Sequence, residues 1–177
     1  MSWVTDIEEA EELILQAGTC RSIDNRRVAT SMRCMSFCDV ATFTKEFGAL
    51  IHRLMQLSSD EVCHYAVLDP HPKHFFLRLF NKYPVIELHL ENMPDQYTAS
   101  LNESPGENSV DALNTLCDEW VLIPNSHNWF VHCRRSSEQS SGHLWLPERW
   151  IQDAQNAYSG LRYPSELEPN DDPTWSS

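Results

Sequence analysis

The chain has 177 residues, in which 26 Asp and Glu oppose 13 Lys and Arg to give a formal net charge of −13 and an isoelectric point near 4.9. This balance argues against direct DNA or RNA binding, because such surfaces need clustered basic side chains that neutralise phosphates. No apolar run approaches the roughly 20 residues of a membrane span, and residues 1–8 lack the basic and apolar parts of a signal peptide, so we expect a cytoplasmic protein of one domain.

The first half of the chain contains two segments with helical periodicity. Residues 5–8 have the Thr-x-x-Glu spacing of a capping box, and the apolar residues that follow predict a helix that ends at Gly18. Residues 20–40 show no clean period, and no element is assigned to them. Residues 42–57 predict a second amphipathic helix, stopped by Ser58-Ser59-Asp60. The apolar stripes are Ile7, Ala10, Ile14 and Ala17 in the first helix and Phe43, Phe47, Leu50, Ile51 and Leu54 in the second.

The centre of the chain is rich in β-branched and aromatic residues. Residues 62–68, 75–80 and 85–90 form three short runs of this kind, separated by Pro-containing turns, and each predicts a strand. Residues 91–108 contain Pro, Gly, Asn and Ser and predict a long loop. Ser109 is then expected to cap a short helix that uses Val110, Leu113 and Leu116.

The last third predicts a hairpin and a helix. Residues 119–123 and 128–133 flank a four-residue turn, as in two antiparallel strands. After the polar run 136–141, Pro147 is placed for the first turn of a helix that presents Trp150, Ile151, Ala154 and Tyr158 and ends at Gly160. We therefore predict a single α+β domain over residues 1–161, mostly antiparallel sheet with flanking helices, followed by a disordered acidic tail over residues 162–177.

Two groups of side chains are candidates for catalysis or metal binding. His64, His71 and His74 lie near Asp69 in the sequence, but Pro70 and Pro72 explain this segment equally as a rigid turn. Cys133 next to His132, with Asp118 nearby, contains the residue types of a catalytic triad, yet adjacent residues of a strand point to opposite faces.

The six cysteines come without a secretory signal and are expected as reduced thiols. Cys34 and Cys38 have the spacing of half a zinc site but lack a second pair, and Cys117 and Cys133 are expected to pack as small hydrophobic residues. No phosphate-binding loop, dinucleotide fingerprint or nucleophile elbow is present in the sequence. We therefore predict no catalytic residues, no metal and no cofactor.

The distribution of charge favours a protein-binding surface. Residues 1–20 contain five acids and no Lys or Arg. Acids in a first helical turn also suit the helix dipole, so a solvated face explains them as well. Trp129 at the hairpin and Trp145 beside a polar loop are candidates for exposed aromatic anchors with acids around them. The predicted partner-binding residues are Glu8, Glu9, Glu11, Glu12, Asp118, Glu119, Trp129 and Trp145.

The segment Glu119-Trp-Val-Leu-Ile-Pro-Asn-Ser-His-Asn-Trp-Phe-Val-His-Cys-Arg-Arg135 resembles a hairpin of small cytoplasmic immunity proteins of bacterial toxin systems. In that hairpin an aromatic residue opens the second strand and an Arg closes it. The resemblance covers about a tenth of the chain, and Ser136 to Ser141 departs from the aliphatic strand that often follows. It implies a single-domain inhibitor of a cognate toxin, commonly a basic nuclease, and carboxylates placed like phosphates suit a basic cleft.

The sequence therefore predicts a protein that binds and neutralises a basic toxin by occluding its active site, without turnover. Two alternatives stay open. One is a small enzyme that uses His64, His71, His74 and Asp69, with or without a metal ion. The other is an adaptor whose acidic tail, residues 162–177, docks onto a larger assembly.

Overall fold

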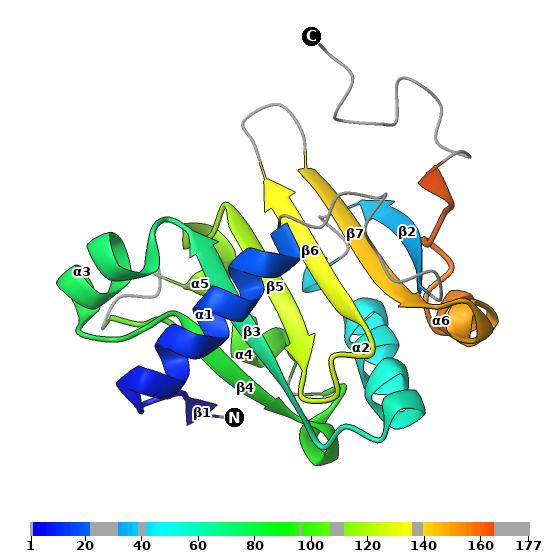
Figure 1. Cartoon of the computed structure of the whole chain (residues 1–177), viewed down its shortest axis with the longest axis horizontal. Coiled ribbons are helices and arrows are strands. Elements are labelled where there is room, and N and C mark those ends of the chain that lie inside the picture. The colour runs from blue at the N-terminus through cyan, green and yellow to red at the C-terminus, as the bar shows by residue number, and fades with distance from the viewer. Residues whose placement is uncertain are drawn as a thin grey trace, which may run out of the picture.

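The computed structural model describes residues 2–21, 32–38, 42–95, 97–106, 112–135 and 140–164 (Figure 1). Seven strands form one antiparallel sheet in the order β1-β4-β3-β5-β6-β7-β2. The strands are β1 (Ser2–Trp3), β2 (Met32–Cys38), β3 (Val62–Asp69), β4 (Val85–His89), β5 (Glu119–Pro124), β6 (Phe130–Arg135) and β7 (Ser140–Pro147). The α-helices are α1 (Ile7–Arg21), α2 (Lys45–Ser58), α3 (Arg78–Phe80), α4 (Tyr97–Leu101), α5 (Leu113–Leu116) and α6 (Ile151–Ala157). The shorter helical turns are η2 (Pro72–Leu77), η3 (Leu90–Asn92) and η5 (Glu148–Trp150). This is the single α+β domain, mostly antiparallel sheet with flanking helices, that the sequence predicts.

Helices cover both faces of the sheet, so alternate residues of the central strands belong to two different cores. On one face the apolar side of α2 packs with residues of α4, α6 and the strands in the larger core. On the other face α1 crosses the strands (Figure 1), with Ala10 and Ala17 against Ala66, Val121 and their neighbours in a smaller core. Small alanine side chains allow α1 to approach the sheet closely. Because both faces are covered, a large side chain on either face of a central strand can be buried.

The first two predicted helices are confirmed, with corrections at both ends of α1. The helix runs past Gly18 to Arg21, and at its start the carboxylate of Asp6 accepts the backbone N–H of Glu9 at 2.9 Å. Asp6 is therefore the capping residue that the sequence assigned to Thr5. In α2 the hydroxyl of Thr44 accepts the N–H of Phe47, and Ser59 ends the helix in the left-handed conformation.

The strands predicted at 62–68 and 85–90 are confirmed as β3 and β4, but the strand predicted at 75–80 is wrong. Residues 72–80 instead form a π-helical turn, η2, that continues into α3. Pro72 occupies the first turn and the ring of His71 accepts the N–H groups of Lys73 and His74, at 3.2 and 3.4 Å, so this segment carries both helix-start signals.

Three other elements differ from the sequence prediction. Residues 91–108 are not one long loop, because they contain η3 and α4, with Tyr97 and Leu101 of α4 in the larger core. β2 lies within the unassigned stretch 20–40, and β7 begins inside the polar run 136–141. The short helix α5 is present at Leu113–Leu116, whereas Ser109 and Val110, predicted to begin it, lie outside the described residues.

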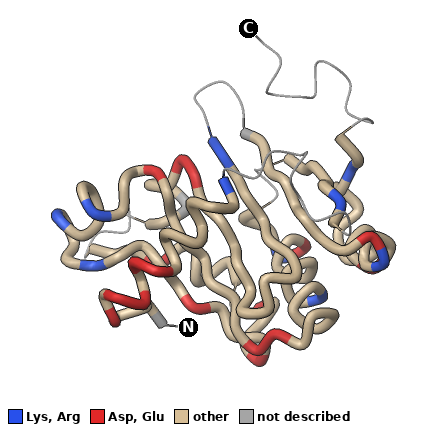
Figure 2. Tube along the Cα trace, viewed as in Figure 1, with Lys and Arg blue, Asp and Glu red and all other residues tan. Residues whose placement is uncertain are grey.

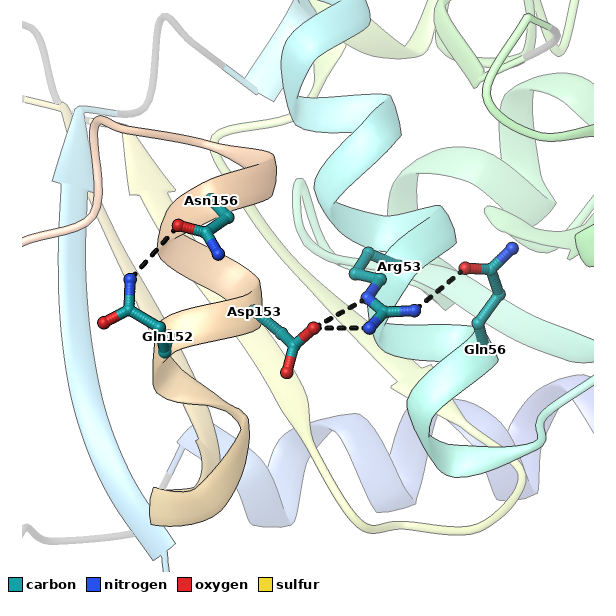
Figure 3. A network of polar contacts seen from close by, with 5 residues as sticks. All are labelled: Arg53, Gln56, Gln152, Asp153 and Asn156. Carbon is teal, nitrogen blue, oxygen red and sulfur yellow. Dashed lines mark hydrogen bonds and ion pairs between the residues drawn. The ribbon is translucent and has the colours of Figure 1, made fainter.

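The C-terminal part follows the prediction of a hairpin and a helix. β5 and β6 pair antiparallel, and the predicted helix consists of η5 and α6. Arg53 of α2 donates to Asp153 of α6 through two guanidinium nitrogens and to Gln56 through the third (Figure 3). Arg162, assigned to the tail, exchanges backbone hydrogen bonds of 2.8 and 2.9 Å with Ser36 of β2, so the domain extends to Arg162. Residues 165–177 lie outside the described residues.

Candidate functional site: the surface of α1

Most of the predicted acids lie together on the solvent side of α1. Glu8, Glu9, Glu11 and Glu12 are all exposed, and Figure 2 shows acidic residues gathered in the N-terminal half of the helix. Ala10 and Ala17 face the sheet, so Glu11 and Glu12 between them are left on the outside. Their position near the start of the helix is also favourable for the helix dipole.

Two large aliphatic side chains lie exposed on the same helix. Ile7 and Leu15 are 57% and 71% exposed. They are separated by eight residues, with Glu11 midway, so all three lie along one side of α1. We call Ile7, Glu8, Glu11, Glu12 and Leu15 the α1 surface. The helical period places Ile7 on the apolar stripe with Ala10 and Ala17, and its exposure shows that this is wrong. Leu15 falls outside that stripe.

A cavity of about 720 Å³ opens beside the α1 surface. Its walls are mainly apolar, with charged groups at Glu11, Arg21 and Lys73. Residues from α1, the end of β3, η2 and the segment before β4 contribute to it: Glu11, Ile14, Leu15, Gly18, Thr19, Arg21, Leu68, His71, Pro72, Lys73 and Tyr83. Apolar walls with a few convergent polar groups are typical of sites that bind a ligand or a partner side chain.

Glu11 is held in place at the edge of this cavity. Its Oε1 accepts the hydroxyl of Tyr83 at 2.5 Å and the ammonium of Lys73 at 3.1 Å. The hydrogen bond from Tyr83, followed by the contact with Lys73, lowers the pKa of Glu11, and the same bond raises the pKa of Tyr83 to about 12. Glu11 is therefore a fixed negative charge at the edge of the cavity at neutral pH.

Glu119 is not an exposed acid. Only 2% of the residue is exposed, its carboxylate lies 3.1 Å from Arg21 and 2.8 Å from His132, and Asp118 is the exposed member of the pair. Burial raises the pKa of Glu119, but the hydrogen bond from His132 and the charges of His132, Arg21 and Arg134 outweigh it and lower that pKa overall. Glu119 thus anchors the C-terminal end of α1 to the sheet and is not available to a partner.

The prediction that Trp129 and Trp145 are exposed anchors is wrong. Trp129 is fully buried in the larger core, and its indole N–H donates to Ser58 at 3.1 Å. Trp145 is also buried and stacks on Phe130, with ring centroids 5.8 Å apart. Both rings fill interior space that the helices and neighbouring strands enclose, so any apolar anchor on the α1 surface is aliphatic.

The histidine group proposed for an enzyme does not assemble. His64 lies near the start of β3 and His71 follows its end, so the strand rise of about 3.3 Å per residue holds them roughly 20 Å apart. His71 and His74 do approach each other, with ring centroids 4.5 Å apart. Among the described residues, the group of donors with metal-binding spacing is Glu9, His64 and Glu87, and it contains neither His71, His74 nor Asp69.

The suggested pair His132 and Cys133 lies on opposite faces of the sheet. His132 points to Glu119, on the α1 face, while Cys133 is buried in the larger core. Cys34 and Cys38 lie on one strand, so about 13 Å separates their backbones and they cannot share one ion. Cys34 has its Sγ 3.8 Å from Nδ1 of His143, a contact the sequence did not suggest, but burial raises its pKa to about 12 and keeps the thiol protonated.

The chain matches no family model, no curated protein and no solved structure in the comparisons made with known proteins. None of the helices in the described part of the chain is long and apolar enough to cross a membrane. The functional interpretation therefore depends on the residues of the α1 surface and its cavity.

Proposed function

We propose that this protein is an immunity-type inhibitor that binds a basic protein through the α1 surface. The observation that carries the proposal is the combination on one exposed helix of carboxylates with two exposed aliphatic side chains, Ile7 and Leu15, beside an apolar cavity. An apolar centre with a charged rim is the usual organisation of a protein interface. Leu15 and the cavity supply the apolar contacts, and Glu8, Glu11 and Glu12 supply the charged rim.

The charge supports a basic partner. A net charge of −13 attracts a positively charged protein at long range, and electrostatic steering of this kind raises association rates by about 10- to 1,000-fold at low ionic strength. Glu8 and Glu12 are exposed, so their main contribution is to the association rate and to its salt dependence. Leu15 buries apolar surface only in the complex, so its main contribution is to the dissociation rate.

That the partner is a toxin rests on the resemblance of residues 119–135 to immunity proteins. Side chains of this segment hold the fold together, because Trp120, Trp129 and Val131 are core residues and Glu119 anchors α1. The proposal therefore assigns the hairpin to the scaffold and the contact with the toxin to α1. If the toxin is a nuclease, the carboxylates of α1 would occupy a cleft that is basic because it binds phosphates.

The proposal is tested by affinity capture from the cells that carry the gene, at low and at physiological salt. Three tagged proteins are compared: wild type, the α1 variant E8Q/E12Q/L15A, and the control variant E46Q/E103Q. The control removes the same number of charges from exposed acids of α2 and of the segment after α4, far from the α1 surface in sequence. Mass spectrometry identifies the co-eluting protein and measures its stoichiometry. Its net charge then follows from its sequence.

We expect wild type and the control variant to recover one basic protein in a one-to-one ratio, held less tightly as salt rises. The α1 variant should lose it. Purified wild type should then abolish the activity of that protein. Recovery of the same partner by the α1 variant, or of a partner without a basic surface, would contradict the proposal.

A further inference from the structure

A second group of side chains lies under the N-terminal half of α1, between the helix and the sheet. His64 on β3 and Glu87 on β4 are directly opposite each other in the strand register. Cys63, Tyr65, Ile86 and Leu88 belong to the larger core, so His64 and Glu87 both point to the α1 face. Glu9 of α1 reaches the same place, and one donor atom from each of the three residues lies within 4.8 Å of the others.

His64 is the buried member of this group. It is 6% exposed. One of its ring nitrogens faces the carboxylates of Glu9 and Glu87. A buried imidazole beside two carboxylates is a set of donors that a metal ion can bind.

We propose that Glu9, His64 and Glu87 form a binding site for a divalent transition-metal ion, and that Zn²⁺ fits it best. One imidazole and two carboxylates are donors that zinc accepts in proteins, whereas Ca²⁺ and Mg²⁺ prefer oxygen ligands alone. With a neutral imidazole the two carboxylates bring a charge of about −2, which the ion neutralises. This site is independent of the proposed partner, since it is formed within the chain.

The three donor atoms need to approach one another only slightly to bind a zinc ion. Bond lengths of about 2.0–2.2 Å in a tetrahedral zinc site place ligand atoms about 3.3 Å apart, and Glu9 is an exposed helical side chain that can rotate inward. Nε2 of His89 lies 3.4 Å from Oε2 of Glu87 and can orient that carboxylate from behind. Burial lowers the pKa of His64, and the charge of Glu87 opposes this effect.

An ion at this position would join α1 to β3 and β4. Three protein ligands also leave a fourth coordination position open to water. The ion would fix the end of the helix that carries Glu8 and Glu11 and would stabilise the fold, because the site does not exist in the unfolded chain.

The test is a Zn²⁺ titration of the metal-stripped full-length chain, kept reduced, by calorimetry and by thermal unfolding. Wild type is compared with E9Q and E87Q, and with two controls. H74Q removes half of the His71–His74 pair, and E46Q removes an exposed acid on the opposite face. Co²⁺ replaces Zn²⁺ in a parallel absorption measurement, because a cobalt ion bound by thiolate shows a near-ultraviolet charge-transfer band and one bound by His and Glu does not.

We expect one Zn²⁺ per chain, at least 10-fold weaker binding in E9Q and E87Q, and unchanged binding in H74Q and E46Q. At 100 times the dissociation constant the unfolding temperature of wild type should rise by about 5–10 °C, and that of E9Q should not. The proposal is overturned if wild type binds no Zn²⁺, if E9Q binds as wild type does, if H74Q abolishes binding, or if Co²⁺ shows thiolate ligation. Glu9 is exposed, so E9Q should fold even if E87Q does not.

Discussion

Replacing Glu119 with glutamine should destabilise the protein without changing its surface. The carboxylate accepts from His132 at 2.8 Å and lies 3.1 Å from the guanidinium of Arg21, the last residue of α1. Glutamine has nearly the same shape and can still accept one hydrogen bond, but it loses the negative charge. The substitution therefore separates the charge of Glu119 from its packing.

The expected loss is about 2 kcal/mol in the free energy of unfolding, within the usual range for a hydrogen bond to a charged group. Most of it should come from His132, because half of the Arg21 side chain is exposed and such ion pairs contribute little. For a domain of this size, 2 kcal/mol lowers the unfolding temperature by about 4–8 °C. The control is D118N, which changes the exposed neighbour and should stay within about 0.5 kcal/mol of wild type.

The effect should depend on pH with a defined sign. The pKa of Glu119 is lower in the folded protein than in the unfolded chain, so its charge stabilises the fold fully above the unfolded value, near 4.3, and less as pH falls through the folded value. Urea unfolding at pH 7 and at pH 3.5 measures this. The difference between wild type and E119Q should be largest at pH 7 and smaller in acid. An equal difference at both values, or none at pH 7, would refute the assignment of Glu119 as a charged anchor.

Three further predictions concern other parts of the fold. D60N should lower the free energy of unfolding, measured in urea, by about 2 kcal/mol. The buried carboxylate of Asp60 accepts the backbone N–H and the hydroxyl of Ser126, in the turn between β5 and β6, at 2.8 and 2.7 Å. G142A should lower the unfolding temperature, since a Cβ there would meet the ring of Phe37 at 2.1 Å and overpacking costs about 1–3 kcal/mol; an unchanged value would show that the ring moves freely. Iodoacetamide at pH 8 should alkylate exposed Cys38 well before Cys34, whose pKa burial raises to about 12, as peptide mass spectrometry would show.

The elements that sequence predicts well are those with a clear period and a local stop signal. The stripe of α2 and the turn between β5 and β6 are examples, because a few neighbouring residues decide them. Residues 75–80 mislead because Phe75, Phe76 and Phe80 favour strands on average, while the local start signals at His71 and Pro72 favour a helix, and these prevail. β7 was missed along its whole length, although Leu144 and Leu146 alternate with His143 and Trp145 in the way a strand requires.

The candidate sites depend more on tertiary structure. The acids of α1 are visible in the sequence because they are consecutive, but the burial of Trp129 and Trp145 is not, since it requires knowing that both faces of the sheet are covered. In the sequence Glu119 resembles an exposed acid at the end of a strand. Only the tertiary structure shows that Arg21 of α1 lies beside it. Glu9, His64 and Glu87 come from three elements, and only the packing of α1 on β3 and β4 brings them together.

The most direct test of the α1 surface is hydrogen–deuterium exchange of the protein alone and in complex with the basic partner that affinity capture recovers. The account predicts slower exchange on binding in α1 and in the residues that line its cavity, at Lys73 and Tyr83 among them, with α2 and α6 unchanged. Protection confined to α2 and α6, on the opposite face of the sheet, would contradict it, because the partner would then bind where the described structure offers neither the acids nor the exposed aliphatic residues of α1.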